Sequence, residues 1–353
     1  MKRWRAGALV LALAAAAGSL VGCSTLGYYA QSVGGHLEVM RRARPVDDWL
    51  ADGSTPAALR ERLQLSQQMR DFAVRELKLP DNRSYRRYAD LGRDAVVWNV
   101  VAAPELALTL KTWCYPLMGC VGYRGYFDRA EADTLAGTLK AEGLDVNVYG
   151  VPAYSTLGWT NWLGGDPLLN TFIRWSEGEL ARLIFHELAH QVAYAADDTT
   201  FNESFATAVE RIGGARWREH RGASDAEDAA FEQRRRDFRA LSLRTRARLQ
   251  ALYASAADEA DKRRGKAEIL AAMRDELARL KAGPWQGYAG YDAWAAKANN
   301  ATFGVQAAYD ELVPDFERLF ERQGRDFTRF YAEARRLAAL PKAERRATLQ
   351  ARP

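Results

Sequence analysis

The chain has 353 residues, of which 48% are hydrophobic and 11% aromatic, which suffices for a packed core and excludes a disordered protein. Its formal net charge of +5 includes Lys2, Arg3 and Arg5. Without these three residues the charge is 5 − 3, about +2, so the charge does not call for a nucleic-acid partner.

The first residues have the composition of an export signal. The basic residues precede an apolar stretch from Ala6 to Gly22, which is short for a membrane span of roughly 20 residues. The stretch ends in Leu20-Val21-Gly22-Cys23, which resembles the lipobox of bacterial lipoproteins. This resemblance implies a signal peptide over residues 1–22 and a lipid anchor on Cys23. Ser24 resembles the signal that sorts such proteins to the outer membrane, facing the periplasm. The alternative is a plain signal peptide with an incidental cysteine.

The N-terminal part, about residues 24–90, is predicted to be mostly helical. Apolar residues recur at helical spacing from Tyr28 to Leu37 and from Leu59 to Leu77. A short apolar, β-branched run from Ala95 to Ala102 then predicts a strand. A helix is predicted from Arg129 to Glu142.

Two cysteines, Cys114 and Cys120, lie close together in the sequence. In an oxidising compartment this spacing favours a local disulfide. A zinc site is the alternative, but it would need further Cys or His ligands, and none is close in sequence.

A second strand is predicted from Val146 to Leu157. It contains Pro152, which has no N–H to donate to a neighbouring strand and therefore belongs at a sheet edge. Because an extended peptide can add itself to such an edge, we expect this strand to hold the backbone of a peptide substrate.

The segment from Leu180 to Ala193 contains the pattern His-Glu-x-x-His and is predicted to be one helix. His186 and His190 are one turn apart on the same face, so their imidazoles can bind one Zn²⁺. Glu187 would lie beside the metal, where its carboxylate can take a proton from a water molecule as the general base. A surface helix with two half-exposed histidines is the alternative. The apolar residues around the motif argue against it, because they imply burial.

A third ligand is expected from the next helix. Glu203 follows His190 after 12 residues and lies in Asn202-Glu203-Ser204-Phe205-Ala206. This motif resembles the second motif of gluzincin aminopeptidases, which implies that Glu203 is the third zinc ligand. Its carboxylate could instead form a capping box with Thr200. Glu210, two turns further along the same face, is the fallback ligand.

The connection between the two helices must be tight. Asp197, Asp198 and Thr199 are expected to make the turn. Asp197 or Asp198 could instead orient a ligand imidazole, but turn-making is the preferred role.

The region from Asp225 to Lys281 is rich in Arg, Glu and Ala, with apolar residues at helical spacing. It predicts a helical hairpin that turns near residues 258–265. Its arginines are interpreted as a solvated face rather than a nucleic-acid surface. The C-terminal region from Ala301 to Ala338 is again predicted to be helical.

Taken together, these segments resemble a family of bacterial zinc lipoproteins described as aminopeptidases. The resemblance covers nearly the whole mature chain and includes four further segments: Gly27-Tyr28-Tyr29, the run from Gly122 to Phe127, the run from Ala153 to Trp159, and Asn299-Asn300-Ala301. It implies a membrane-anchored zinc peptidase that acts on peptides with one Zn²⁺ on His186, His190 and Glu203.

The expected fold is α+β and mostly α-helical: a zincin-like core with a small mixed β-sheet and flanking long helices. We expect a single domain over residues 23–353, with the sheet and the metal motifs in about 91–220 and a helical part in about 221–345. Tyr309 is the first candidate to stabilise the oxyanion of the reaction, with Tyr288 and Tyr154 as others.

Two other functions remain open from the sequence. One is a catalytically idle envelope lipoprotein whose zinc is structural and which acts as a scaffold. The other is a zinc endopeptidase that acts on envelope proteins or peptidoglycan peptides. Acidic residues that would bind the free amine of an aminopeptidase substrate could not be placed.

Overall fold

The computed structural model describes residues 27–115, 119–153, 164–222 and 226–351, and most of them are helical. The helices are residues 27–42, α2 (Val46–Ala51), α3 (Ala57–Arg75), α4 (Arg129–Ala141), α5 (Glu177–Ala189), α6 (Thr199–Arg221), α7 (Ala226–Ala254), α8 (Glu259–Ala282), α9 (Asp292–Lys297), α10 (Asn300–Asp310), α11 (Val313–Arg322), α12 (Phe327–Ala338) and α13 (Lys342–Gln350). The mostly helical α+β fold expected from the sequence is confirmed.

The strands form three small sheets. They are β1 (Arg44–Pro45), β2 (Arg87–Ala89), β3 (Val97–Pro104), β4 (Trp113–Tyr115), β5 (Gly119–Val121), β6 (Arg124–Tyr126), β7 (Leu144–Val151) and β8 (Leu168–Leu169). The orders are β1-β2-β8, β6-β3-β7 and β4-β5. Only the β2–β8 pair is parallel among these strands. A disulfide between Cys114 and Cys120 joins β4 to β5.

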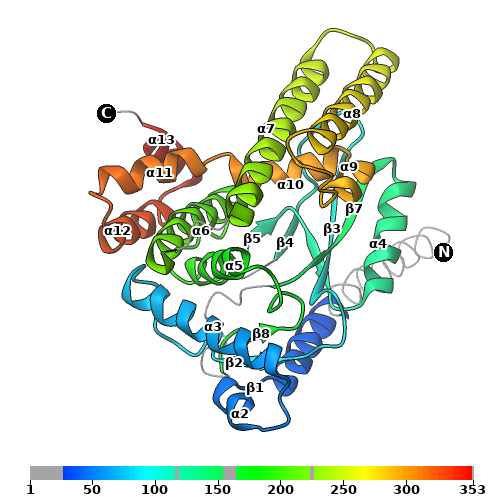
Figure 1. The fold of residues 1–353 in the computed structure, drawn as a ribbon. Helices are drawn as coiled ribbons and strands as arrows, with labels where there is room; N and C mark the ends of the chain where they lie inside the picture. Colours follow the sequence, from blue (N-terminus) through cyan, green and yellow to red (C-terminus); the bar gives the residue numbers. More distant parts are fainter. Residues whose placement is uncertain (1–26, 116–118, 154–163, 223–225, 352–353) are drawn as a thin grey trace, which may run out of the picture.

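The sheet β6-β3-β7 lies between two helices, with α4 on one face and α10 on the other (Figure 1). Because side chains alternate along a strand, Val100 and Ala102 of β3 pack toward α4, whereas Val101 and Ala103 pack toward Ala301 of α10. β3 pairs with β7 over eight antiparallel positions, and β7 forms the outer strand in the described part of this sheet.

The predicted edge strand is therefore confirmed for residues 146–151, and the strand begins two residues earlier than predicted, at Leu144. Pro152 directly follows its end. The continuation from Tyr154 to Leu157 lies outside the described residues.

Helices α5 and α6 pack against each other at the centre of the molecule (Figure 1). Two glycines of α6 allow this close approach. A Cβ atom at Gly213 would lie 2.7 Å from Leu77 and 3.0 Å from Phe185, and one at Gly214 would lie 2.9 Å from Arg182. Any larger residue at these positions would push the two helices apart, and these are the helices that carry the metal motifs.

Helices α7 and α8 run side by side as a hairpin that projects from the rest of the molecule (Figure 1). The hairpin was predicted, but its turn was placed a few residues too late. The chain leaves α7 after Ala254, and α8 begins at Glu259 because Asp258 caps it by accepting a hydrogen bond from the Asp261 N–H.

Among the described residues, no helix has the length and apolar character needed to cross a bilayer. The expected signal peptide and Cys23 lie outside these residues.

Candidate metal centre

Helix α5 carries the His-Glu-x-x-His motif and begins with a capping box. The Ser176 hydroxyl accepts a hydrogen bond from the Glu179 N–H, and the Glu179 carboxylate accepts one from the Ser176 N–H. The helix ends at Ala189, with His190 as its C-cap. The prediction of one helix through Ala193 was therefore wrong by about one turn. His190 nevertheless keeps helical backbone angles, so its side chain stays on the same face as that of His186.

Helix α6 begins one residue before Thr200, and this decides the role of Glu203. The N-cap is Asp198, whose carboxylate accepts a hydrogen bond from the Phe201 N–H. The alternative capping box between Thr200 and Glu203 is therefore wrong. The Glu203 side chain instead turns toward α5, where its Oε2 lies 3.4 Å from His186 Nε2 and 3.6 Å from His190 Nε2.

Three donor atoms thus face one another in the spacing that a tetrahedral ion needs. One ligand atom each from His186, His190 and Glu203 lies within 4.8 Å of the others. Ligands about 2.1 Å from a tetrahedral zinc ion are about 3.4 Å from each other, close to the two distances measured to Glu203. Both Glu203 Oε2 and His190 Nδ1 are buried and make no regular hydrogen bond to a described residue. These residues fit a metal ion, because a cation would satisfy the buried carboxylate oxygen.

The local electrostatics favour a cation at this point. Burial raises the pKa of Glu203, but the imidazoles of His190 and His186 lower it by more, so the net pKa lies well below its usual range. Burial lowers the pKa of His186, whereas its contacts with Glu203 and Glu210 raise the net pKa to about 10. The carboxylates of Glu203 and Glu210 thus favour positive charge at His186.

Glu210, the fallback ligand, lies behind His186 rather than beside Glu203. Its Oε2 is 3.2 Å from His186 Nδ1, the ring nitrogen that faces away from Glu203. A carboxylate in this position fixes the tautomer and orientation of a ligand imidazole. Arg235 in turn donates a hydrogen bond of 3.1 Å to Glu210, and Arg182 lies 3.7 Å from it.

Glu187 lies beside the three donors and is almost fully buried. Burial raises the pKa of its carboxyl group, and the neighbouring imidazoles lower it, with burial the larger effect. A raised carboxyl pKa brings this group closer to the working range of a general base at neutral pH.

A cleft of about 640 Å³ reaches Glu203 and is lined partly by tyrosines. Tyr123 and Tyr149 both line it, from the face of the sheet that packs against α10. Burial raises the pKa of each phenol, that of Tyr149 to about 12, and the Glu203 charge contributes to both shifts. Sequence reasoning missed these two residues as site candidates. Tyr123 lies in the run from Gly122 to Phe127 that carries the family resemblance, which was the available signal.

The tyrosines named from the sequence have different outcomes. Tyr288 packs in an aromatic cluster with Trp285 and Tyr291, apart from the cleft. Tyr154 lies outside the described residues. Tyr309 belongs to α10, but its side chain is outside the described part, so its role stays a prediction.

A family model described as "Putative aminopeptidase" matches residues 27–349 of the chain. The chain belongs to this aminopeptidase family. No curated protein and no solved structure matches it. Membership supports a peptidase and does not specify a cofactor.

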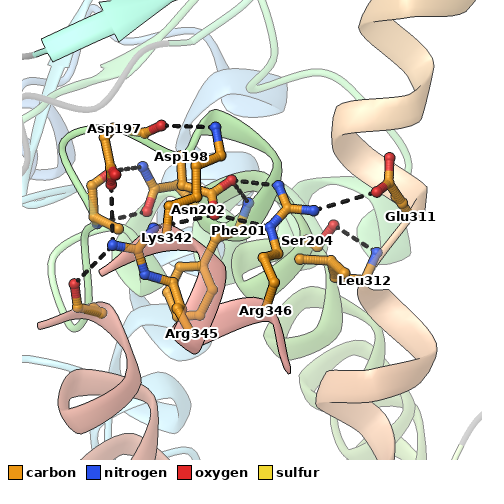
Figure 2. A network of polar contacts seen from close by, with 12 residues as sticks. Asp197, Asp198, Phe201, Asn202, Ser204, Glu311, Leu312, Lys342, Arg345 and Arg346 are labelled. Carbon is orange, nitrogen blue, oxygen red and sulfur yellow. Dashed lines mark hydrogen bonds and ion pairs between the residues drawn. The ribbon is translucent and has the colours of Figure 1, made fainter. Parts of the chain in front are cut away.

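In this family member, the connection between α5 and α6 is held by the C-terminal helix α13, as Figure 2 shows. Arg345 donates hydrogen bonds to Asp197 (3.0 Å) and Asp198 (3.1 Å), and Arg346 donates two to Asp198, one to each oxygen, the first of 2.9 Å. Asn202 closes the loop from inside, because its side chain bonds both the N–H and the carbonyl of Ala195 at 2.8 Å.

The two aspartates make the turn, as predicted, and Asp198 also caps α6, whereas Thr199, expected in the same turn, is the first residue of α6. Among the described residues, neither carboxylate forms an ion pair with an imidazole, and both are held by arginines instead. The arginines of α13 therefore fix the start of the helix that carries Glu203.

Proposed function

We propose that this protein is a zinc-dependent peptidase, of the aminopeptidase kind, with His186, His190 and Glu203 as the metal ligands. The observation that carries the proposal is the meeting of two imidazole nitrogens and one buried carboxylate oxygen at 3.4 and 3.6 Å. Three protein ligands leave one tetrahedral position open, as in catalytic rather than structural zinc sites.

When bound, the ion supplies a Lewis acid that lowers the pKa of a water molecule and polarises a peptide carbonyl. Glu187 then accepts the proton of the attacking water and delivers it to the leaving amine. Its burial and its position between the two ligand histidines in the sequence fit this role. Glu210 keeps the ring of His186 in place through its Nδ1 atom.

The substrate backbone would lie along β7, which is the outer strand of its sheet among the described residues and could pair with an extended peptide. At Val146 the carbonyl already accepts a hydrogen bond of 3.0 Å from the Asn299 side chain. Tyr123 and Tyr149 line the cleft with Glu203, so their hydroxyl groups can donate hydrogen bonds to the oxyanion that develops during attack. Tyr309 remains the sequence-based candidate for the same task.

An endopeptidase is the second candidate, because of the charges in the cleft. Three of its described acids, Asp197, Asp198 and Glu311, are already paired with arginines of α13. They offer no unpaired carboxylate to a substrate amine. Peptides with free and with acetylated N-termini separate the two candidates, because an aminopeptidase cleaves only the free ones.

The decisive experiment replaces the general base while leaving the ligands. Glu187→Gln should lower kcat by at least about 10²-fold, the lower bound for losing a general base, while the protein still binds one zinc per chain. Glu131→Gln on the exposed face of α4 is the matched control and should keep wild-type turnover. Unchanged turnover in Glu187→Gln would contradict the mechanism, and a phenotype that survives this change would favour the scaffold.

We also propose that a lipid on Cys23 anchors the mature chain in the outer membrane, facing the periplasm. The support is the lipobox-like sequence before Cys23 together with Ser24. Labelling of growing cells with a radioactive fatty acid tests this. Wild-type protein should take up the label and stay with the membrane fraction, whereas Cys23→Ala should do neither.

A further inference from the structure

The acidic side chains that line the cleft are paired within the described part of the protein, whereas one of its basic side chains is not. The acids on one side are neutralised by α13: Asp197 by Arg345 at 3.0 Å, and Glu311 by Arg346 at 3.2 Å (Figure 2). Asp198 is paired with both arginines and is 1% exposed. Glu203 is the remaining acid of this lining, and it faces the histidines. The carboxylates of the cleft thus have their counter-charges within the protein.

Arg246, on α7, lines the same cleft and has no such partner. Its side chain is half-buried, and its Nε atom is buried without a hydrogen-bond partner. Within the described part of the chain, it forms no ion pair. Lys342, the other cation of this lining with a described side chain, donates a hydrogen bond of 3.1 Å to the Asp197 carbonyl.

An arginine that is half-buried and unpaired costs free energy unless a ligand completes its hydrogen bonds. The planar guanidinium matches a carboxylate, which can accept two parallel hydrogen bonds from it. Gln250 and Tyr253 follow at one and two turns on the same side of α7 and also line the cleft. The Tyr253 hydroxyl already donates a hydrogen bond of 2.8 Å to Asn300. The guanidinium of Arg246 is therefore the group on this side of the cleft that suits a carboxylate.

We propose that Arg246 binds a carboxylate of the peptide substrate and so determines specificity. The inference rests on the proposed peptidase function, because it assigns the substrate class of that same cleft. The carboxylate can come from two sources, the C-terminus of a short peptide or the side chain of an acidic residue. Both present the same two oxygens to the guanidinium.

The test compares two pairs of tripeptides with free N-termini, using the full-length mature protein loaded with zinc. One pair differs only in a C-terminal carboxylate or amide, and the other only in Glu or Gln within a C-terminally amidated tripeptide. The wild-type protein should favour the carboxylate in one pair by about 10- to 100-fold in kcat/KM, as expected for hydrogen bonds to a charged group. The pair that shows the preference identifies the source.

Arg246→Gln should bring this ratio close to one, and Arg246→Lys should retain part of it, because lysine keeps the charge but loses the planar pair of donors. Arg248→Gln is the matched control, two residues further along α7 on an exposed position outside the cleft lining, and should keep the wild-type ratio. Equal rates within both pairs for the wild type, or an unchanged ratio in Arg246→Gln, would overturn the proposal.

A binding measurement separates this proposal from the proposed function. Zinc-loaded Glu187→Gln protein should bind the carboxylate member of the preferred pair about 10- to 100-fold more tightly than its neutral partner. Adding Arg246→Gln should abolish that difference. If no peptide is hydrolysed but this binding difference is found, the peptidase function fails and the carboxylate subsite stands. If peptides are hydrolysed without a binding difference, the subsite fails alone.

Discussion

Asp198→Asn should destabilise the protein by about 3 kcal/mol, although it changes only one atom. The Asp198 carboxylate accepts hydrogen bonds from Arg345 (3.1 Å) and Arg346 (2.9 Å) on one oxygen. The other oxygen accepts one from the Phe201 N–H (3.1 Å) and a second one from Arg346. Asparagine keeps the second oxygen and remains a good N-cap, so the start of α6 should survive.

The first oxygen becomes an amide nitrogen that faces two guanidinium donors. Losing two charge-assisted hydrogen bonds at about 1.5–3 kcal/mol each gives about 3–6 kcal/mol, and breaking a buried ion pair costs about 3–5 kcal/mol. Arg345 keeps Asp197 and Arg346 keeps Glu311, so the lower end of these ranges applies.

Urea unfolding of the metal-free protein, followed by circular dichroism, measures this loss. The matched control is Asp133→Asn on α4, which breaks an ion pair with Arg129 that is more than half exposed and should cost less than about 1 kcal/mol. A loss in Asp198→Asn no larger than that of the control would refute the argument that α13 secures the connection between the two metal-binding helices.

Three further predictions concern the metal site, pH and the disulfide. Glu210→Gln should weaken zinc binding about 10- to 100-fold in a chelator competition, because the carboxylate that orients His186 loses its charge. Burial raises the pKa of Asp198, but the hydrogen bond and charge of Arg346, together with the Phe201 N–H and the charge of Lys342, lower it by more. Its stabilising effect is therefore fully present above the unfolded pKa of about 3.9 and is lost as the pH falls through the lower folded pKa. The stability difference between wild type and Asp198→Asn should accordingly shrink below about pH 4 in urea titrations. Cys114→Ser should cost about 2 kcal/mol, the value for so short a loop, and a reductant should produce the same loss in the wild type.

The elements that depend mainly on residues close together in the sequence could be predicted from the sequence. Helix α4 differs from its predicted range by one residue, and β3 by two residues at each end, because both have strong local periodicity. The end of α5 was missed, since no Gly or Pro follows Ala189 and the chain turns for tertiary reasons. The start of α6 was left open between two alternatives, because Asp198 and Thr200 are both good N-caps; the structure uses Asp198, whose carboxylate the arginines of α13 also bind.

In the candidate site, too, the features set by local spacing could be predicted, and those set by the packing of helices could not. The spacing of His186 and His190 is a local property of one helix, and the sequence placed both. Glu210 could be named as an acid on the correct face of α6, but its position behind His186 depends on how two helices pack, which Gly213 and Gly214 control. Arg246 carries no local signal at all, because it is one of many arginines in a solvated helix.

The construction of the site links metal binding to the folding of the C-terminus. The ligands come from α5 and α6, and the short connection between them is fastened by a helix about 150 residues further along the chain. Because this long-range contact belongs to the folded state in which the proposed ligands meet, binding of a metal ion there should stabilise α13 as well as the two helices. Because such linkage is reciprocal, whatever loosens α13 must also weaken the hold on the metal. In the proposed mechanism, the aspartates that pair with Arg345 and Arg346 therefore act through the geometry of the metal site, while the guanidinium of Arg246 is available to the substrate.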